Sequence, residues 1–260
     1  MSEIFETQEA GSYDSKAESD ASRDKFVARW LAEIELAGKA EENWRKEAEK
    51  AREVYRAEKS GEGQRFNILF SNIQTAVPAL YNSTPTPDVR TRYMDDNEIS
   101  RVSGQAIERI LSYSVDTYDF DSTIRSVVQD RELAGRGGAR VRYLPYEYQG
   151  KVYQEVGCEH FAWKHYRQGP ANRWEDVSWV AFEHFLARDQ LIQLSPRIGQ
   201  GLNLDVTLAE GVDQLKADTA PNVFKRGRVW EIWDKPTRKV IWIAPAYATA
   251  PIREDVDPLG

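Results

Sequence analysis

Residues 135–156, GRGGARVRYLPYEYQGKVYQEV, decide the fold class, because the spacing of the apolar residues changes inside this stretch. Upstream of it, apolar residues recur at the three- and four-residue steps of a helix. After the glycines the period is two, so Val141 and Tyr143 point to one side and Arg140 and Arg142 to the other. A Gln-Gly turn then predicts a hairpin whose return strand carries Val152, Gln154 and Val156 on one face.

Two helices are predicted before this stretch. Residues 66–80 place their apolar side chains at helical spacing, and Pro78 should kink or end that helix, because it removes a backbone donor. Residues 84–87, Thr-Pro-Thr-Pro, then favour an extended exit. Residues 98–117 predict an amphipathic helix with four apolar residues on one side: Val102, Ala106, Ile110 and Tyr113.

Strands dominate the prediction after residue 150. An aromatic-rich strand at 177–185 runs into a short helix at 188–194, and residues 203–216 predict a weaker helix. The last hairpin joins strands at 229–233 and 239–243 through the turn Asp-Lys-Pro-Thr-Arg. Because long helices come first and antiparallel hairpins follow, the predicted class is α+β.

A long amphipathic helix is predicted near the start of the chain. Residues 1–19 are acidic, small and polar, which predicts a disordered tail. Residues 20–60 then repeat apolar side chains at helical steps, as one helix or as two joined near Gly38. Residues 61–260 are predicted to form the α+β domain. The helix either packs on its own domain or contacts another subunit, and the first alternative is favoured because Glu41 occupies an apolar slot of the repeat.

The candidate subunit-contact residues on this helix share its apolar side: Trp30, Ile34, Trp44 and Tyr55. The chain has eight tryptophans in 260 residues, which suggests large aromatic surfaces buried in a core or between subunits.

Charge and cysteine content narrow the possible classes of protein. A net charge of −7 does not suggest a nucleic-acid clamp, because sequence-independent DNA binding usually shows a basic face. A single cysteine, Cys158, excludes an intramolecular disulfide framework and fits a reducing compartment. The longest charge-free apolar run, residues 240–252, is too short and too proline-interrupted to span a bilayer, so the sequence predicts a soluble intracellular protein without a membrane partner.

Residues 225–239 form a locally basic stretch that contains six basic and two acidic residues. If several copies of the chain formed a ring, the repeated basic stretches could contact DNA phosphates. A charged hairpin is more often a solvent-exposed sheet edge that resists the addition of another strand. The candidate phosphate-contact residues are Lys225, Arg226, Arg228, Lys235, Arg238 and Lys239.

No motif in the sequence predicts catalysis or a cofactor. The glycines at 135–138 follow a helix and precede a strand, which is the reverse of a phosphate-binding loop, so a tight turn is preferred. A metal site would have to use Cys158, His160, His165 and His184, but a Cys-x-His pair in a strand lacks the knuckle that brings zinc ligands together. We therefore expect no metal, no cofactor and no enzyme activity.

Four stretches resemble blocks of tailed-phage portal proteins of the podovirus type. The first is 66–93, FNILFSNIQTAVPALYNSTPTPDVRTRY, and the second is 112–143, SYSVDTYDFDSTIRSVVQDRELAGRGGARVRY. The third lies at 174–191, with WEDVSWVAFEHFLARDQL, and the fourth at 229–243, with VWEIWDKPTRKVIWI. They occur in the same order as in the family, and the closing Asp-Pro-Leu-Gly also looks like a family segment.

The resemblance implies a structural subunit of a portal ring of about twelve copies at one capsid vertex, which serves DNA packaging, DNA ejection and head-tail attachment. It implies contacts with the major capsid protein or scaffold, a head-tail adaptor, a terminase and the genomic double-stranded DNA. The location would be the virion, and the host cytoplasm during assembly. The matching blocks belong to the wing of the portal, so the stem, the clip and the terminase contacts would lie beyond this chain.

Two other functions remain open from the sequence. One is a different structural protein of the phage head or tail, such as an adaptor, and the other is an enzyme with an atypical metal site built around Cys158 and His160.

Overall fold

The computed structural model describes residues 10–57, 66–90, 97–207 and 225–257. The chain is α+β and forms two compact units. Unit 1 consists of residues 1–41 and 165–260, and unit 2 consists of residues 42–164. The expected domain 61–260 is therefore divided between the two units, because the first helix of the chain packs on the C-terminal sheet whereas the second helix packs with the residues that follow it.

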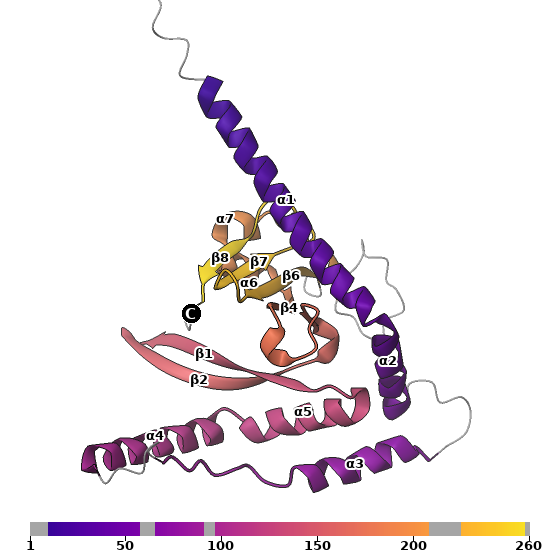
Figure 1. Cartoon of the computed structure of the whole chain (residues 1–260), viewed down its shortest axis with the longest axis vertical. Coiled ribbons are helices and arrows are strands. Elements are labelled where there is room, and N and C mark those ends of the chain that lie inside the picture. Colours follow the sequence, from indigo (N-terminus) through magenta and orange to yellow (C-terminus); the bar gives the residue numbers. More distant parts are fainter. Residues whose placement is uncertain (1–9, 58–65, 91–96, 208–224, 258–260) are drawn as a thin grey trace, which may run out of the picture. The chain divides into compact units, whose positions relative to one another are not determined.

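Unit 1 is an antiparallel sheet with a long helix on one face. The helix is α1 (Ala10–Ala40), and the strands are β3 (Tyr166–Gln168), β4 (Trp179–Leu186), β5 (Val206–Thr207), β6 (Lys225–Asp234), β7 (Lys239–Ile243) and β8 (Arg253–Val256). Their order is β3-β4-β6-β7-β8, and β5 pairs with the start of β6. Figure 1 shows α1 in indigo, running past the strands.

The core of unit 1 follows from the alternation of the strands. Alternate residues of β4, β6 and β7 face α1 and meet its buried side chains Val27, Trp30 and Ile34. The opposite face is covered at one end by α6 (Arg188–Leu194) and α7 (Pro196–Gly199), where Leu191 and Val229 are fully buried. The predicted last hairpin is confirmed, since Asp234 pairs with Lys239 across the turn.

Unit 2 contains four helices and a separate two-stranded sheet. The helices are α2 (Glu42–Arg56), α3 (Ile68–Leu80), α4 (Glu98–Thr117) and α5 (Phe120–Ala134), and the strands are β1 (Gly138–Tyr148) and β2 (Lys151–Phe161). The predicted hairpin is confirmed, because Tyr143 pairs with Val156 and Val141 with Cys158. The turn residues Gln149 and Gly150 both have positive φ, as a two-residue hairpin turn requires.

Polar side chains fix the ends of the helices in unit 2. Asn67 accepts a hydrogen bond from the backbone N–H of Phe70 and donates its amide to the carbonyl oxygens of Val54 and Tyr55, at 2.7 and 3.1 Å. One asparagine thus begins α3 and ends α2. Asn97 begins α4 by accepting from the N–H of Ile99.

The glycine cluster is a tight turn between α5 and β1. Gly135 ends α5 in the left-handed region with φ 76°, and its N–H donates to the carbonyl of Arg131. A Cβ on Gly137 would lie 1.9 Å from the carbonyl oxygen of Val127, so only glycine fits this close approach. The close approach of the two backbone segments therefore explains why this turn needs glycine at position 137.

The structure differs from the sequence prediction at three boundaries of secondary-structure elements. α1 begins at Ala10, so residues 10–19 are helical and only residues 1–9 of the expected tail lie outside the described residues. Alanine, lysine and glutamate favour a helix there in spite of the low hydrophobicity. The long helix is interrupted at Glu41, and it ends at Arg56 instead of near residues 58–60, because Ala57 adopts a left-handed conformation with φ 55°.

The third change concerns the weak helix expected at 203–216. Its described part contains the strand β5 at Val206–Thr207, and residues 208–216 lie outside the described residues. The prediction is wrong for the described part, because Val206 pairs with Arg226 of β6. Pro78 lies inside α3, which ends two residues later and is followed by the predicted extended segment.

Candidate functional site

Trp30 and Ile34 are buried inside unit 1. They are 2% and 4% exposed and belong to the cluster between α1 and the sheet. The ring of Trp30 stands edge-on to Trp179 at a centroid distance of 5.8 Å. This placement corrects their assignment as subunit-contact residues, because a second chain could not reach them without opening the core.

Trp44 and Tyr55 lie on α2 and pack within unit 2. The Trp44 indole N–H donates to the carbonyl of Ala134 at 2.8 Å, and its ring lies 5.4 Å from that of Trp163. Tyr55 stacks on Phe70 at 5.3 Å and its hydroxyl accepts from the side chain of Gln74. Both are partly buried, and the four candidates therefore do not form one surface.

The six basic candidates form two separate groups at opposite ends of β6. Lys225, Arg226 and Arg228 belong to its start, whereas Lys235 and Arg238 belong to the turn that follows it and Lys239 begins β7. A ten-residue strand spans about 30 Å, so the two groups do not form one phosphate-binding patch.

Several of these cations already have partners in unit 1. Arg228 lies 3.3 Å from Glu183, and Lys239 lies 3.1 Å from Glu254. Lys235 donates to the backbone carbonyl of Glu175 at 2.8 Å. A phosphate would have to compete with these contacts, which makes the stretch a weaker candidate for DNA than its charge suggests.

The candidate metal ligands are held by separate partners. His160 lies 2.8 Å from Asp130 of α5, and His165 lies 2.8 Å from Glu183 of β4. Burial and the nearby Glu159 raise the pKa of the Cys158 thiol, which disfavours the thiolate that zinc needs. Among the described residues, no group of three or more His, Cys, Asp or Glu side chains converges for a metal ion.

His184 belongs to a buried polar cluster on the sheet that the sequence did not predict. Its Nε2 lies 2.7 Å from Oε2 of Glu231, and the other carboxylate oxygen of Glu231 accepts a hydrogen bond from the indole N–H of Trp233 at 2.8 Å. Glu231 is only 3% exposed. The sequence feature that could have revealed this cluster is the single carboxylate in the run VWEIW. A charged side chain between large apolar residues becomes buried with them and then needs hydrogen-bond partners inside the protein.

We expect Glu231→Ala to lower the free energy of unfolding by about 2 kcal/mol, because it leaves buried donors without an acceptor. Glu231→Gln should cost less, since its amide keeps one acceptor oxygen. Glu254→Ala on the same sheet removes an exposed pair with Lys239 and should cost less than about 1 kcal/mol. Urea unfolding of the three variants checks this order, and equal losses for Glu231→Ala and Glu254→Ala would contradict it.

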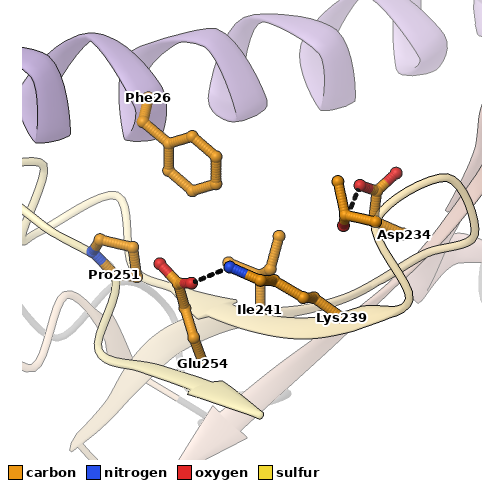
Figure 2. Close-up of a pocket in the computed structure, with 7 residues that line it drawn as sticks. Phe26, Asp234, Lys239, Ile241, Pro251 and Glu254 are labelled. Carbon is orange, nitrogen blue, oxygen red and sulfur yellow. Dashed lines mark hydrogen bonds and ion pairs between the residues drawn. The ribbon is translucent and has the colours of Figure 1, made fainter. Parts of the chain in front are cut away.

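A small pocket lies between α1 and the edge of the sheet in unit 1. It has a volume of about 280 Å³, and Phe26 and Ile241 supply its apolar walls. Figure 2 shows Lys239 joined to Glu254 at its rim. Thr237 donates to Asp234 at 2.5 Å on the other side. Lys239 and Glu254 neutralise each other, whereas Asp234 is held only by a neutral hydroxyl among the lining residues, so the pocket presents one carboxylate to a ligand.

The apolar side of α4 is exposed. Ile99, Val102, Ile110 and Tyr113 are between 54% and 76% exposed, and Ala106 is exposed as well. We call this row the α4 stripe; it consists of Ile99, Val102, Ala106, Ile110 and Tyr113. The sequence predicted these residues, apart from Ile99, as an apolar side, and the described residues of unit 2 leave them exposed.

The β1–β2 hairpin has an exposed apolar face as well. The pairing of Val141 with Cys158, Tyr143 with Val156 and Glu147 with Val152 places these side chains on one side. We call the exposed apolar residues of this side the hairpin face; they are Val141, Tyr143, Val152 and Val156. On the other side, Arg140 and Arg142 both pair with Glu159.

Comparisons with known proteins give no relative. A scan against models of protein families yields no match, and a search of curated proteins finds no significant similarity. Within the described residues, no helix has the length and apolar content needed to cross a membrane.

Proposed function

We propose that this chain is a structural subunit of a phage portal ring at the capsid vertex. The proposal rests on the four ordered blocks of sequence that resemble the podovirus-type family. The α+β class is compatible with the wing part of such a subunit. In this role the protein does no chemistry and supports DNA packaging, DNA ejection and head-tail attachment.

One structural observation carries the assembly part of the proposal. Most of the large apolar side chains that the described residues leave exposed belong to unit 2, on α3, α4 and the β1–β2 hairpin. Soluble monomers rarely expose apolar patches larger than a few hundred Å², and larger ones mark contacts with other molecules. A subunit whose neighbours cover such surfaces in an assembly accounts for this distribution.

The proposed partners follow from the resemblance alone. They are further copies of the chain, the major capsid protein or scaffold, a head-tail adaptor, a terminase and genomic double-stranded DNA. The two basic groups on β6 are the candidate contacts to DNA phosphates, and repetition around a ring would add their weak contributions.

The alternative of a different head or tail adaptor shares the same assembly and differs in the partner that it binds. A metal-dependent enzyme receives less support, because the described histidines each bind a carboxylate in a different place.

We expect the purified chain to form a closed cyclic oligomer in a concentration-dependent manner, because each contact is weak alone and ring closure reinforces it. Sedimentation velocity over a range of concentrations measures this directly. A single monomer peak at every concentration would overturn the proposal, whereas a discrete species of about twelve copies supports it.

A further inference from the structure

We propose that neighbouring copies contact each other through two different surfaces: the α4 stripe of one subunit packs on the hairpin face of the next. This inference rests on the proposed ring and names its contact residues. Both surfaces belong to unit 2, so each copy presents one of each to its neighbours.

The α4 stripe has the pattern of a helix that packs against another element. Ile99, Val102, Ala106, Ile110 and Tyr113 recur at steps of three, four, four and three residues, so they form one narrow row along the helix. All of them are exposed within their own chain. Within the part of the chain that the structure describes, the row therefore lacks the covering layer that an amphipathic helix normally has.

The hairpin face needs such a layer for a separate reason. Among the described residues β1 and β2 pair only with each other, along eleven residues. A two-stranded sheet is marginally stable unless another element covers its apolar face. α5 supports the base of the hairpin, where Thr123 donates to the carbonyl of Cys158 and Asp130 binds His160. Val141, which pairs with Cys158, is nevertheless 73% exposed, and Val152 near the turn is 67% exposed.

The size of the two surfaces fits a subunit contact. Val, Ile and Tyr side chains that are half or more exposed present on the order of 100 Å² each. The large apolar residues of the α4 stripe and the hairpin face together present on the order of 800 Å². One contact pairs the α4 stripe of one copy with the hairpin face of the next, about 400 Å² from each, so these side chains bury about 800 Å² in total, half of a standard interface. This area fits a contact that is weak alone and is reinforced by ring closure.

Charges disfavour pairing of α4 with itself. Glu98 and Asp116 lie about five helical turns apart, on the same flank of the stripe. In a symmetric antiparallel α4–α4 pair centred on the stripe, Glu98 of each copy would lie opposite Asp116 of the other, and like charges would repel. The ion pair of Glu98 with Arg101 at 3.4 Å weakens this repulsion without removing the charge of Asp116. A helix-on-sheet contact avoids this repulsion. Because it joins two unlike surfaces, it is also the type of contact that generates rings.

Two variants, each of which blocks one of the two surfaces, test the proposal in the full chain. Ile110→Glu places a charge in the α4 stripe, and Val141→Glu places one in the hairpin face. Both positions are exposed, so each variant should keep the melting temperature of the unmodified chain. The matched control is Leu36→Glu, which changes an aliphatic residue of α1 that is 63% exposed.

Each blocked variant alone should lose the ring, since burial of an unpaired charge should weaken the contact roughly 100-fold or more. An equimolar mixture of the two should give one-to-one dimers and nothing larger, because each variant keeps one intact surface. Leu36→Glu should assemble like the unmodified chain. Native mass spectrometry distinguishes the two variants in the mixture by mass.

Two results would overturn the inference and leave the ring intact. One is normal assembly of both variants, which would mean that other residues of the chain cover these surfaces. The other is normal assembly of Val141→Glu with loss only in Ile110→Glu, which would indicate α4–α4 contacts. If the unmodified chain is itself monomeric under these conditions, both the inference and the proposed function are wrong.

Discussion

Trp30→Ala should lower the free energy of unfolding by about 3 to 5 kcal/mol, the cost of removing a fully buried large side chain. Trp30 is 2% exposed, and its ring contacts Phe26 and Trp179 edge-on. Alanine would leave a cavity between α1 and the sheet, and α1 would lose its main attachment to unit 1. Chemical denaturation followed by circular dichroism measures the loss.

Trp30→Phe provides a sharper comparison. The indole nitrogen of Trp30 is buried and has no hydrogen-bond partner among the described residues. Phenylalanine removes this unsatisfied donor and keeps most of the ring, so its cost should be well below that of alanine. Leu36→Ala, at an exposed position of the same helix, should change stability by less than about 0.5 kcal/mol. Equal losses for Trp30→Ala and Leu36→Ala would show that α1 does not pack on the sheet.

Trp44→Ala should cost about 3 kcal/mol in unit 2, slightly less than a fully buried tryptophan because Trp44 is only partly buried. It removes the hydrogen bond to Ala134, the edge contact with Trp163 and the cation–π contact with Arg136 at 4.3 Å. These contacts join α2 to the end of α5. Calorimetry of the variant checks the effect.

Trp174→Ala is the matched control for Trp44→Ala, since Trp174 is 68% exposed and its loss should be nearly neutral. Because Trp30 and Trp44 belong to different units, their effects should add in the double variant within about 0.5 kcal/mol. A melting curve of Trp44→Ala that matches that of Trp174→Ala would contradict the packing of α2.

Local signals predicted the elements of this fold well. The bounds of α4 and α6 agree with the helical spacing of the sequence, and the turn from Asp234 to Lys239 agrees with its proline and charged residues. Such signals depend on neighbours within one or two turns of chain, so they can be read from a single sequence.

The division of the long N-terminal helix could not be predicted with the same certainty. The sequence placed Trp30 and Trp44 on one apolar side, but they belong to α1 and α2 in different units. Glu41 in an apolar slot was the available sign of the interruption. The partners of Trp30 and Trp44 include Trp179 and Ala134, which lie 90 or more positions away, and periodicity carries no information about them.

The polar clusters were missed for the same reason. Each histidine binds a carboxylate from another element, such as Asp130 for His160 and Glu231 for His184. Sequence spacing grouped Cys158, His160 and His165 as possible ligands, whereas His160 binds Asp130 and His165 binds Glu183. The exposure of the α4 stripe was also unexpected, since an apolar side usually indicates burial within the chain.

The most direct test of the central claim, assembly into a portal-type ring, is electron microscopy of the purified full chain with class averaging. The account predicts closed rings of uniform size with a central opening and about twelve repeats. Averages that show only single small particles, at concentrations where sedimentation also finds monomer, would contradict it.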